Sequence, residues 1–119
     1  MELIEGDYRY QKGKTGEKIS EEFLLTEGHK ILYKNFRKSS GEIDIISEKG
    51  ETIFFIEVKF WKSKFISPLE TFHKSKILKM QRTAERFLAE NVSFRSHLVS
   101  FSLISIGENK EIQFYSNLF

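Results

Sequence analysis

The alternation of apolar and polar positions predicts two adjacent strands in the middle of the chain. Residues 43–46 and 53–60 are rich in β-branched and aromatic side chains, and the polar residues 47–51 between them are typical of a turn. We therefore expect a β-hairpin. Its second strand is apolar on both faces, which is typical of a central strand that is covered on both sides.

A helix and a short strand are expected before this hairpin. Thr15 can cap a helix over residues 16–27, and Gly28 is placed to end it. The apolar residues of 29–33 predict a short strand. His29, beside the end of the helix, is expected to be a surface or capping residue.

A second helix and two further strands are expected after the hairpin. Ser67 and Pro68 form a strong helix start, and the helix should run to about Glu90, with a break allowed near Ser75. Strands follow at residues 96–106 and around 112–114. The order of helix, three strands, helix and two strands predicts an α/β fold with a central mixed sheet flanked by helices.

Composition limits the size and the class of the protein. A chain of 119 residues forms one domain, which we place at residues 15–119 behind a mobile, polar lead-in of residues 1–14. The absence of cysteine excludes disulfides and a thiolate metal site. No apolar run reaches the length of a membrane span, so we expect a cytoplasmic protein without a membrane partner.

The positions of the charged residues indicate more about function than the net charge does. The formal net charge is only +2, from 19 Lys and Arg against 17 Asp and Glu. Acidic residues gather in 17–27, whereas residues 59–86 are strongly basic. Such asymmetry is expected when an acidic metal centre lies beside a surface that contacts phosphates, although charge counts alone favour a solvated helix face.

The predicted hairpin carries charged residues inside its strands. Because side chains alternate between faces, Glu42 and Asp44 share one face of the first strand, and Glu57 and Lys59 share one face of the second. Asp44 should then lie opposite or diagonal to Glu57. Two unpaired carboxylates side by side are costly, and a hard cation such as Mg²⁺ or Mn²⁺ would neutralise them. A solvated cross-strand ion pair is the alternative.

These residues also carry a resemblance to a known family. The motifs Gly41-Glu42-Ile43-Asp44 and Ile56-Glu57-Val58-Lys59 resemble those of the YraN family of small bacterial proteins. That family belongs to the PD-(D/E)XK nuclease superfamily, alongside restriction endonucleases and archaeal Holliday-junction resolvases. The resemblance implies a restriction endonuclease-like fold and a Mg²⁺- or Mn²⁺-dependent endonuclease.

The resemblance also implies roles for individual residues. Asp44, Glu57 and the backbone carbonyl of Val58 would be metal ligands, and Glu17 from the first helix would hold a second ion or an ion-bound water. Lys59 would orient the attacking water and stabilise developing charge, because a lysine among carboxylates should keep its proton. Glu17 has a competing explanation as an acid in the first turn of its helix.

Basic side chains around this site are the expected contacts to nucleic acid, most simply DNA: Arg37, Lys62, Lys64, Lys76, Lys79 and Arg82. Lys76, at the border of the apolar stripe of its helix, could instead reach inward toward the acids. Two residues are further candidates for the site. Glu42 would join the metal site or pair with Arg37, and Trp61 would stack on a base or cap the core.

The chain departs from the family in two places. Ser20 stands where the family commonly has alanine, which should not disturb packing, and Arg95-Ser96-His97 replaces the usual Arg-Phe-Asp, which puts any role of that aspartate in doubt. Three hypotheses follow. The first is a nuclease that hydrolyses phosphodiester bonds, selective for DNA structure, for which a symmetric homodimer would suit the cutting of two strands. The second is a nucleic-acid-binding module with the same fold and little turnover, and the third is an interaction domain with a neutralised ion pair.

Overall fold

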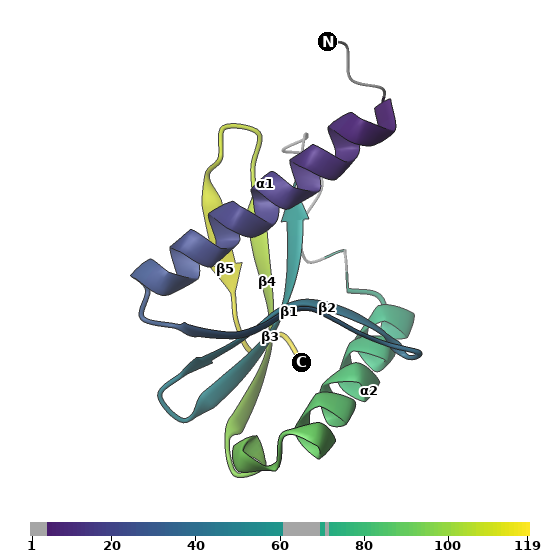
Figure 1. The fold of residues 1–119 in the computed structure, drawn as a ribbon, viewed down its shortest axis with the longest axis vertical. Coiled ribbons are helices and arrows are strands. Elements are labelled where there is room, and N and C mark those ends of the chain that lie inside the picture. The colour runs from purple at the N-terminus through teal and green to yellow at the C-terminus, as the bar shows by residue number, and fades with distance from the viewer. Residues whose placement is uncertain (1–4, 61–69, 71) are drawn as a thin grey trace.

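The computed structural model describes residues 5–60, 70 and 72–119 and has the expected α/β class (Figure 1). The elements follow in the expected order of helix, three strands, helix and two strands. They are α1 (Glu5–Thr26), β1 (Lys30–Lys38), β2 (Gly41–Lys49), β3 (Thr52–Phe60), α2 (Lys74–Glu90), the 3₁₀ turn η2 (Val92–Phe94), β4 (Leu98–Ile106) and β5 (Ile112–Tyr115).

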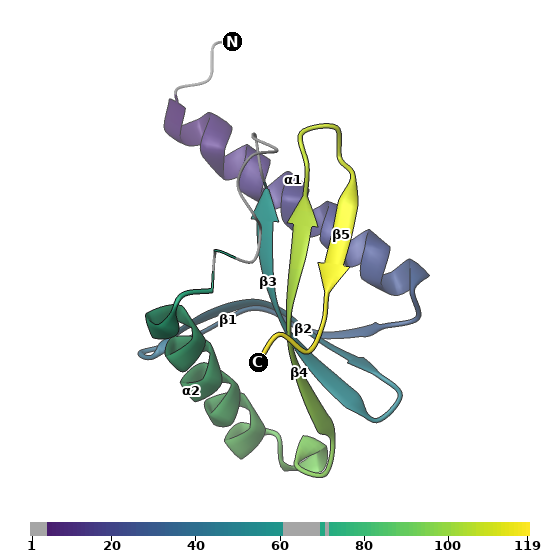
Figure 2. The ribbon, with the colours of Figure 1, turned by 180° about the vertical axis from the view of Figure 1, so that it is seen from behind.

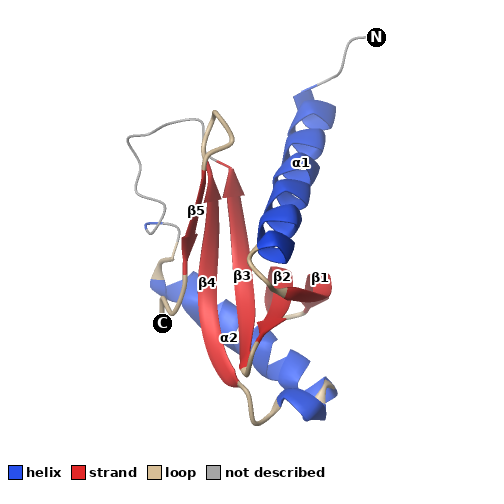
Figure 3. Ribbon diagram, turned by 90° about the vertical axis from the view of Figure 1, so that its left-hand side faces the viewer, coloured by secondary structure: helices blue, strands red, loops and turns tan. Residues whose placement is uncertain are grey.

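The strands form one mixed five-stranded sheet in the order β1-β2-β3-β4-β5. Neighbouring strands are antiparallel except for β3 and β4, which are parallel. Parallel neighbours need a long crossover, and α2 lies in the connection between these two strands. Helix α1 crosses one face of β3, β4 and β5, as the front and back views show (Figures 1 and 2), and it runs beside the sheet in the edge view (Figure 3).

Two apolar clusters cover the two faces of the sheet. Alternate side chains of the strands supply them, so that residues of β3 such as Phe55 and Ile56 contribute to opposite clusters. On the α1 side the buried members are Leu24, Ile45, Ile56, Ile104 and Ile106. On the α2 side they include Ile43, Ile46, Ile53, Phe55, Met80, Ala84, Phe87 and Phe101. The central strand β3 is therefore covered on both faces, as its sequence predicted.

The first helix is longer than the sequence indicated. It begins at Glu5, so the start expected at residue 16 with Thr15 as its cap was wrong. Glu17 consequently lies well inside α1, where the dipole at a helix start has no influence on it. The first-turn explanation of Glu17 is thereby excluded. The mobility of residues 1–14 stays a prediction.

Several other boundaries also differ. β1 extends to Lys38, well beyond the short strand expected at residues 29–33. The turn between β2 and β3 is confined to Gly50 and Glu51, with Gly50 at a φ of 61°, so both strands run further than expected. Helix α2 begins at Lys74, and the two residues before it are not helical. An unbroken helix from Ser67 is therefore ruled out. The expected start at Ser67 and Pro68 lies outside the described residues.

The hairpin of β1 and β2 leaves the plane of the sheet. β2 pairs with β3 only from Ile45 to Lys49, whereas its first residues, from Gly41 to Ile43, pair with β1 alone. In Figure 1 the hairpin accordingly runs across the direction of β3 and β4. Over the described residues, no helix combines the length and the hydropathy that crossing a membrane requires.

Candidate functional site

Asp44 and Glu57 meet where β2 and β3 separate. The last paired residues of the two strands are Ile45 and Ile56, and Asp44 and Glu57 follow them directly, one on each strand. Past this point the N–H of Val58 donates a hydrogen bond of 2.8 Å to Oδ2 of Asp44. A carboxylate thus takes the place of the backbone acceptor that a continued antiparallel pairing would supply. The register brings the two acids together, as the alternation in the sequence indicated.

The environment of Asp44 is unfavourable for a negative charge. Its pKa is raised from 3.8 to about 7, first by burial and next by the negative charge of Glu57. The hydrogen bond from Val58 opposes this shift, while Glu42 and Glu17 add to it. Asp44 is therefore the electrostatic centre of a group of acids, which we call the acidic cluster (Glu17, Glu42, Asp44 and Glu57).

Two lysines compensate part of this charge through Glu57. The Glu57 side chain is only 9% exposed, and its Oε1 lies 2.9 Å from Nζ of Lys76 and 3.9 Å from Nζ of Lys59. Lys76 comes from α2, on the facing layer, and Lys59 from β3 itself. The structure therefore places Lys76 against Glu57 of the acidic cluster, which is the inward position that the sequence offered as an alternative to nucleic-acid contact.

Asn35 links Glu17 to Glu42 and was not assigned a role from the sequence. Its side-chain amide nitrogen faces the two acids and donates hydrogen bonds of 3.0 Å to Oε1 of Glu17 and 3.2 Å to Oε1 of Glu42. Its backbone has a φ of 54°, in the left-handed region that asparagine tolerates better than most residues. One available signal was an asparagine inside a strand, where this residue type is uncommon.

Glu42 also pairs with Arg37, as one interpretation of the sequence expected. Oε2 of Glu42 lies 3.2 Å from a guanidinium nitrogen of Arg37, whose side chain is 75% exposed. An ion pair this open to solvent contributes little stability. Arg37 is consequently free to exchange Glu42 for an incoming anion at small cost.

The donor set fits a hard cation that keeps much of its water shell. Across the described residues, no three side chains of Asp, Glu, His or Cys converge closely enough to hold a metal ion by themselves. Of the acids that raise the pKa of Asp44, Glu57 has the largest effect, and Glu42 and Glu17 have smaller ones. Mg²⁺ is commonly bound through one or two carboxylates with water completing its octahedron, and Mn²⁺ takes similar ligands. The roles of Glu17 and of the Val58 carbonyl as ligands stay predictions.

A cleft of about 230 Å³ lies beside the acidic cluster. Glu42 of the acidic cluster lines this cleft, as does Lys76, which bonds Glu57; His73, Lys79 and Met80 also line it. Lys79 is exposed, as is Arg82 further along the helix. The other expected contacts to nucleic acid, namely Trp61, Lys62 and Lys64, lie outside the described residues.

The five-stranded mixed sheet and its two helices are compatible with a restriction endonuclease-like fold, in which β2 and β3 carry Glu42, Asp44 and Glu57 and α1 carries Glu17. The family model described as "Uncharacterised protein family UPF0102" matches residues 16–106. The chain belongs to this family, which is the YraN family, so the resemblance seen in the two motifs is confirmed.

Relatives in several bacteria match nearly the whole chain. A UPF0102 protein of Leptospira interrogans is 49% identical over 110 residues, covering 92% of this chain and 95% of the relative. One from Clostridium novyi is 44% identical over 92% of each chain, and one from Thermodesulfovibrio yellowstonii is 39% identical over 93% of this chain and 97% of its own. These names state no activity, so a function has to be argued from the site.

Proposed function

We propose that this protein is a divalent-metal-dependent phosphodiesterase that cleaves nucleic acid, most simply DNA. The observation that carries the proposal is the pair of Asp44 and Glu57 at the separation of β2 and β3, with two lysines beside it. The hydrogen bond to Val58 explains the position of Asp44, but the ionised form of Asp44 is disfavoured there. A cation bound between the two acids would remove that penalty.

Asp44 and Glu57 would hold Mg²⁺ or Mn²⁺ by one carboxylate oxygen each. When bound, such an ion supplies a Lewis acid that stabilises the negative charge developing on phosphate oxygens. Val58 keeps Asp44 in place, since its N–H occupies one carboxylate oxygen and leaves the other for the ion. Glu17, which shares the amide of Asn35 with Glu42, would hold a second ion or an ion-bound water.

Lys59 and Lys76 would have different roles in the site. Lys76 bonds Glu57 directly and fixes its carboxylate. Lys59 is further from Glu57 and 40% exposed, so its ammonium group has donors left for the attacking water or for the substrate. Lys79 and Arg82, exposed on α2 beside the cleft, would contact phosphates next to the one that is cleaved.

Metal binding is tested first, by thermal unfolding with Mg²⁺ or Mn²⁺. An ion that binds only the folded state adds about 1.4 kcal/mol of stability at tenfold excess over its dissociation constant. Glu57→Gln should abolish this gain, whereas Glu51→Gln, in the exposed turn before β3, should keep it. An unchanged gain in Glu57→Gln would assign the metal to another place.

Cleavage is tested with a panel of substrates in Mn²⁺: linear, nicked, flapped and four-way DNA, and RNA. We expect product from at least one of them and none from Asp44→Asn. Product that persists undiminished in Asp44→Asn would come from a contaminating nuclease and would contradict the proposal. The panel also identifies the preferred substrate, which the site alone does not define.

A binding module without turnover is the second candidate. The observation in its favour is the 2.9 Å ion pair between Lys76 and Glu57, which neutralises one of the two proposed ligands from within the protein. In that case the protein would shift the mobility of the same substrates in a gel without cutting them. Binding without cleavage, both with and without Mn²⁺, would favour this candidate over the nuclease.

A further inference from the structure

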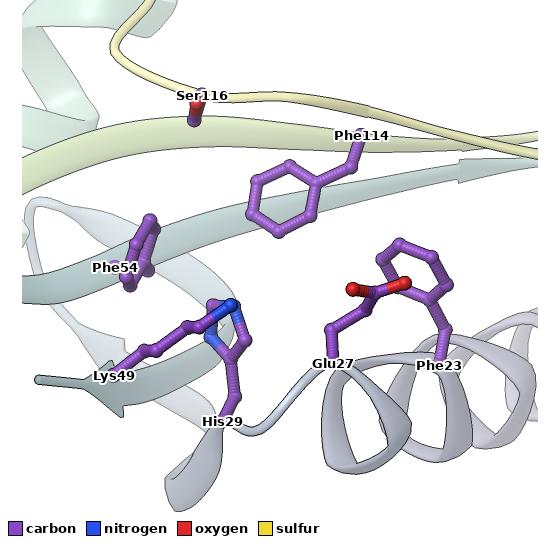
Figure 4. Close-up of a pocket in the computed structure, with 7 residues that line it drawn as sticks. All are labelled: Phe23, Glu27, His29, Lys49, Phe54, Phe114 and Ser116. Carbon is purple, nitrogen blue, oxygen red and sulfur yellow. The ribbon is translucent and has the colours of Figure 1, made fainter.

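A second pocket lies on the α1 side of the sheet and shares no residue with the acidic cluster. Its volume is about 360 Å³, within the range of small-molecule sites. Phe23 enters it from the last turn of α1, and Glu27 and His29 enter from the connection to β1. The strands and the segment after β5 supply the other lining residues, which are Lys49, Phe54, Phe114 and Ser116 (Figure 4). We call it the aromatic pocket.

Aromatic rings form the walls of the aromatic pocket. Phe54 and Phe114 stand edge to face with their centroids 6.0 Å apart, and Phe23 lies at the same distance from Phe114. The imidazole of His29 packs 4.6 Å from the ring of Phe54 and 5.8 Å from that of Phe114. Walls of this kind offer faces and edges on which a planar aromatic ligand stacks.

His29 gives the aromatic pocket a buried polar group. It is only 6% exposed, so the surface position expected from the sequence was wrong, whereas its backbone N–H donates to the carbonyl of Leu24 at the end of α1, as a capping residue does. Its Nδ1 lies 2.9 Å from the hydroxyl of the buried Ser47. Its Nε2 has no hydrogen-bond partner among the described residues, and the ring faces into the aromatic pocket in Figure 4. A ligand can therefore bond this nitrogen, as donor or acceptor according to the tautomer.

Two opposite charges complete the aromatic pocket. Burial lowers the pKa of His29; the positive charge of Lys49 lowers it further and the negative charge of Glu27 opposes this. Both charges therefore act on the same imidazole, from opposite sides of the pocket (Figure 4). Glu27 and Lys49 are exposed and have no ion-pair partner among the described residues, so both remain available to a ligand.

We propose that the aromatic pocket binds a nucleobase that carries a phosphate. The base would stack on Phe54 and Phe114, its amino group would donate to Glu27, and the phosphate would contact Lys49. A quaternary ammonium ion is disfavoured by the positive charge of Lys49, and a purely apolar ligand would leave the buried Nε2 of His29 without a hydrogen bond. The base can belong to a free nucleotide or to a single strand, and the proposal does not depend on the phosphodiesterase activity.

The probe for this proposal is 2-aminopurine riboside 5′-monophosphate, whose fluorescence falls when the base is stacked. We expect saturable quenching by the purified full chain. Phe114→Leu should weaken binding by about tenfold through lost stacking, and Lys49→Gln by about fivefold through the lost phosphate contact. Lys18→Gln, an exposed change on α1 outside the aromatic pocket, should bind like the unmodified protein.

A second binding measurement shows whether the base belongs to a free nucleotide or to a single strand. The same probe is placed in the middle of a short single-stranded oligonucleotide, and the two affinities are compared. Tighter binding of either form supports the proposal and names the source. Phe114→Leu could disturb β5, so circular dichroism checks its fold and Lys49→Gln provides the independent variant. No quenching in either arm, or equal quenching in Lys49→Gln and Lys18→Gln, would overturn the proposal.

Discussion

The carboxylate of Asp44 accepts a 2.8 Å hydrogen bond from the N–H of Val58, across the point at which β2 leaves β3. The bond satisfies a backbone donor that the separating strands would otherwise leave without a partner. It also favours the ionised carboxylate, yet burial and the charge of Glu57 together outweigh it. Asp44 therefore completes the backbone hydrogen bonding where the strands separate, although its ionised form is disfavoured at this position.

The first prediction concerns the pH dependence of stability without metal. The pKa of Asp44 is 3.8 in the unfolded chain and about 7 in the folded protein. Between these two pH values Asp44 therefore binds the proton more tightly in the folded state than in the unfolded chain. Its contribution to stability is therefore lost as pH rises through this window. We expect Asp44→Asn to lose less stability than the unmodified protein over the same window, measured by urea denaturation at a series of pH values. The expectation fails if the two proteins show parallel pH profiles.

The second prediction concerns Lys76 as an internal counter-ion. Lys76→Met leaves the nearly buried carboxylate of Glu57 without its closest cation, which should cost about 1–3 kcal/mol without metal. Added Mn²⁺ should then stabilise Lys76→Met more than it stabilises the unmodified protein, because the ion no longer competes with an ammonium group for Glu57. Thermal unfolding with and without Mn²⁺ measures both effects.

The matched control for Lys76 is one turn further along α2. Lys79→Met changes an exposed lysine of the same helix, and Lys79 has no ion pair among the described residues. It should leave both the stability and the response to Mn²⁺ nearly unchanged. An equal response of the two variants would mean that general charge, and not the contact with Glu57, controls the affinity for the ion.

The centre of the site could be predicted because it follows from local rules. Alternation along two strands and a short turn suffice to bring Asp44 beside Glu57, and an apolar pattern on both faces suffices to bury β3. The order of elements likewise indicated the α/β class. None of these inferences needed the exact end of a strand, which is the least certain part of a sequence pattern.

The parts that could not be predicted depend on distant contacts or on weak patterns. In the sequence Lys76 lies at the border of the apolar stripe of its helix, where an inward and an outward direction are both compatible with the pattern. The packing of α2 on the sheet turns it toward Glu57. The burial of His29 depends on Phe114, which is far away in the sequence. The early start of α1 was hidden by Gly6 and Gly13, which are poor helix formers, so the helix was expected only after them.

The third prediction concerns Ser20, whose hydroxyl is buried in α1. Its side chain is fully buried and its Oγ has no hydrogen-bond partner among the described residues. Replacing it removes the desolvation cost of an unpaired hydroxyl, so Ser20→Ala should stabilise the protein by about 1–2 kcal/mol. Urea denaturation measures the change.

Ser47 provides the opposite case for comparison. It is equally buried, but its hydroxyl lies 2.9 Å from Nδ1 of His29. Ser47→Ala should therefore destabilise the protein, by about 1–3 kcal/mol, because it leaves the buried imidazole nitrogen without a partner. If Ser20→Ala and Ser47→Ala shift stability in the same direction, hydrogen bonding does not distinguish the two sites.

The last prediction concerns His29 and acid. Its pKa lies below the ordinary 6.5 in the folded protein, chiefly because burial disfavours the imidazolium, with Lys49 adding to the effect and Glu27 opposing it. The unfolded chain therefore takes up this proton first, and the contribution of His29 to stability is lost as pH falls below 6.5. His29→Phe keeps an aromatic ring beside Phe54 and cannot titrate. We expect its stability, measured by urea denaturation, to fall less over the first pH unit below 6.5 than that of the unmodified protein. Identical slopes would show that the folded protein accepts the proton on His29 without penalty.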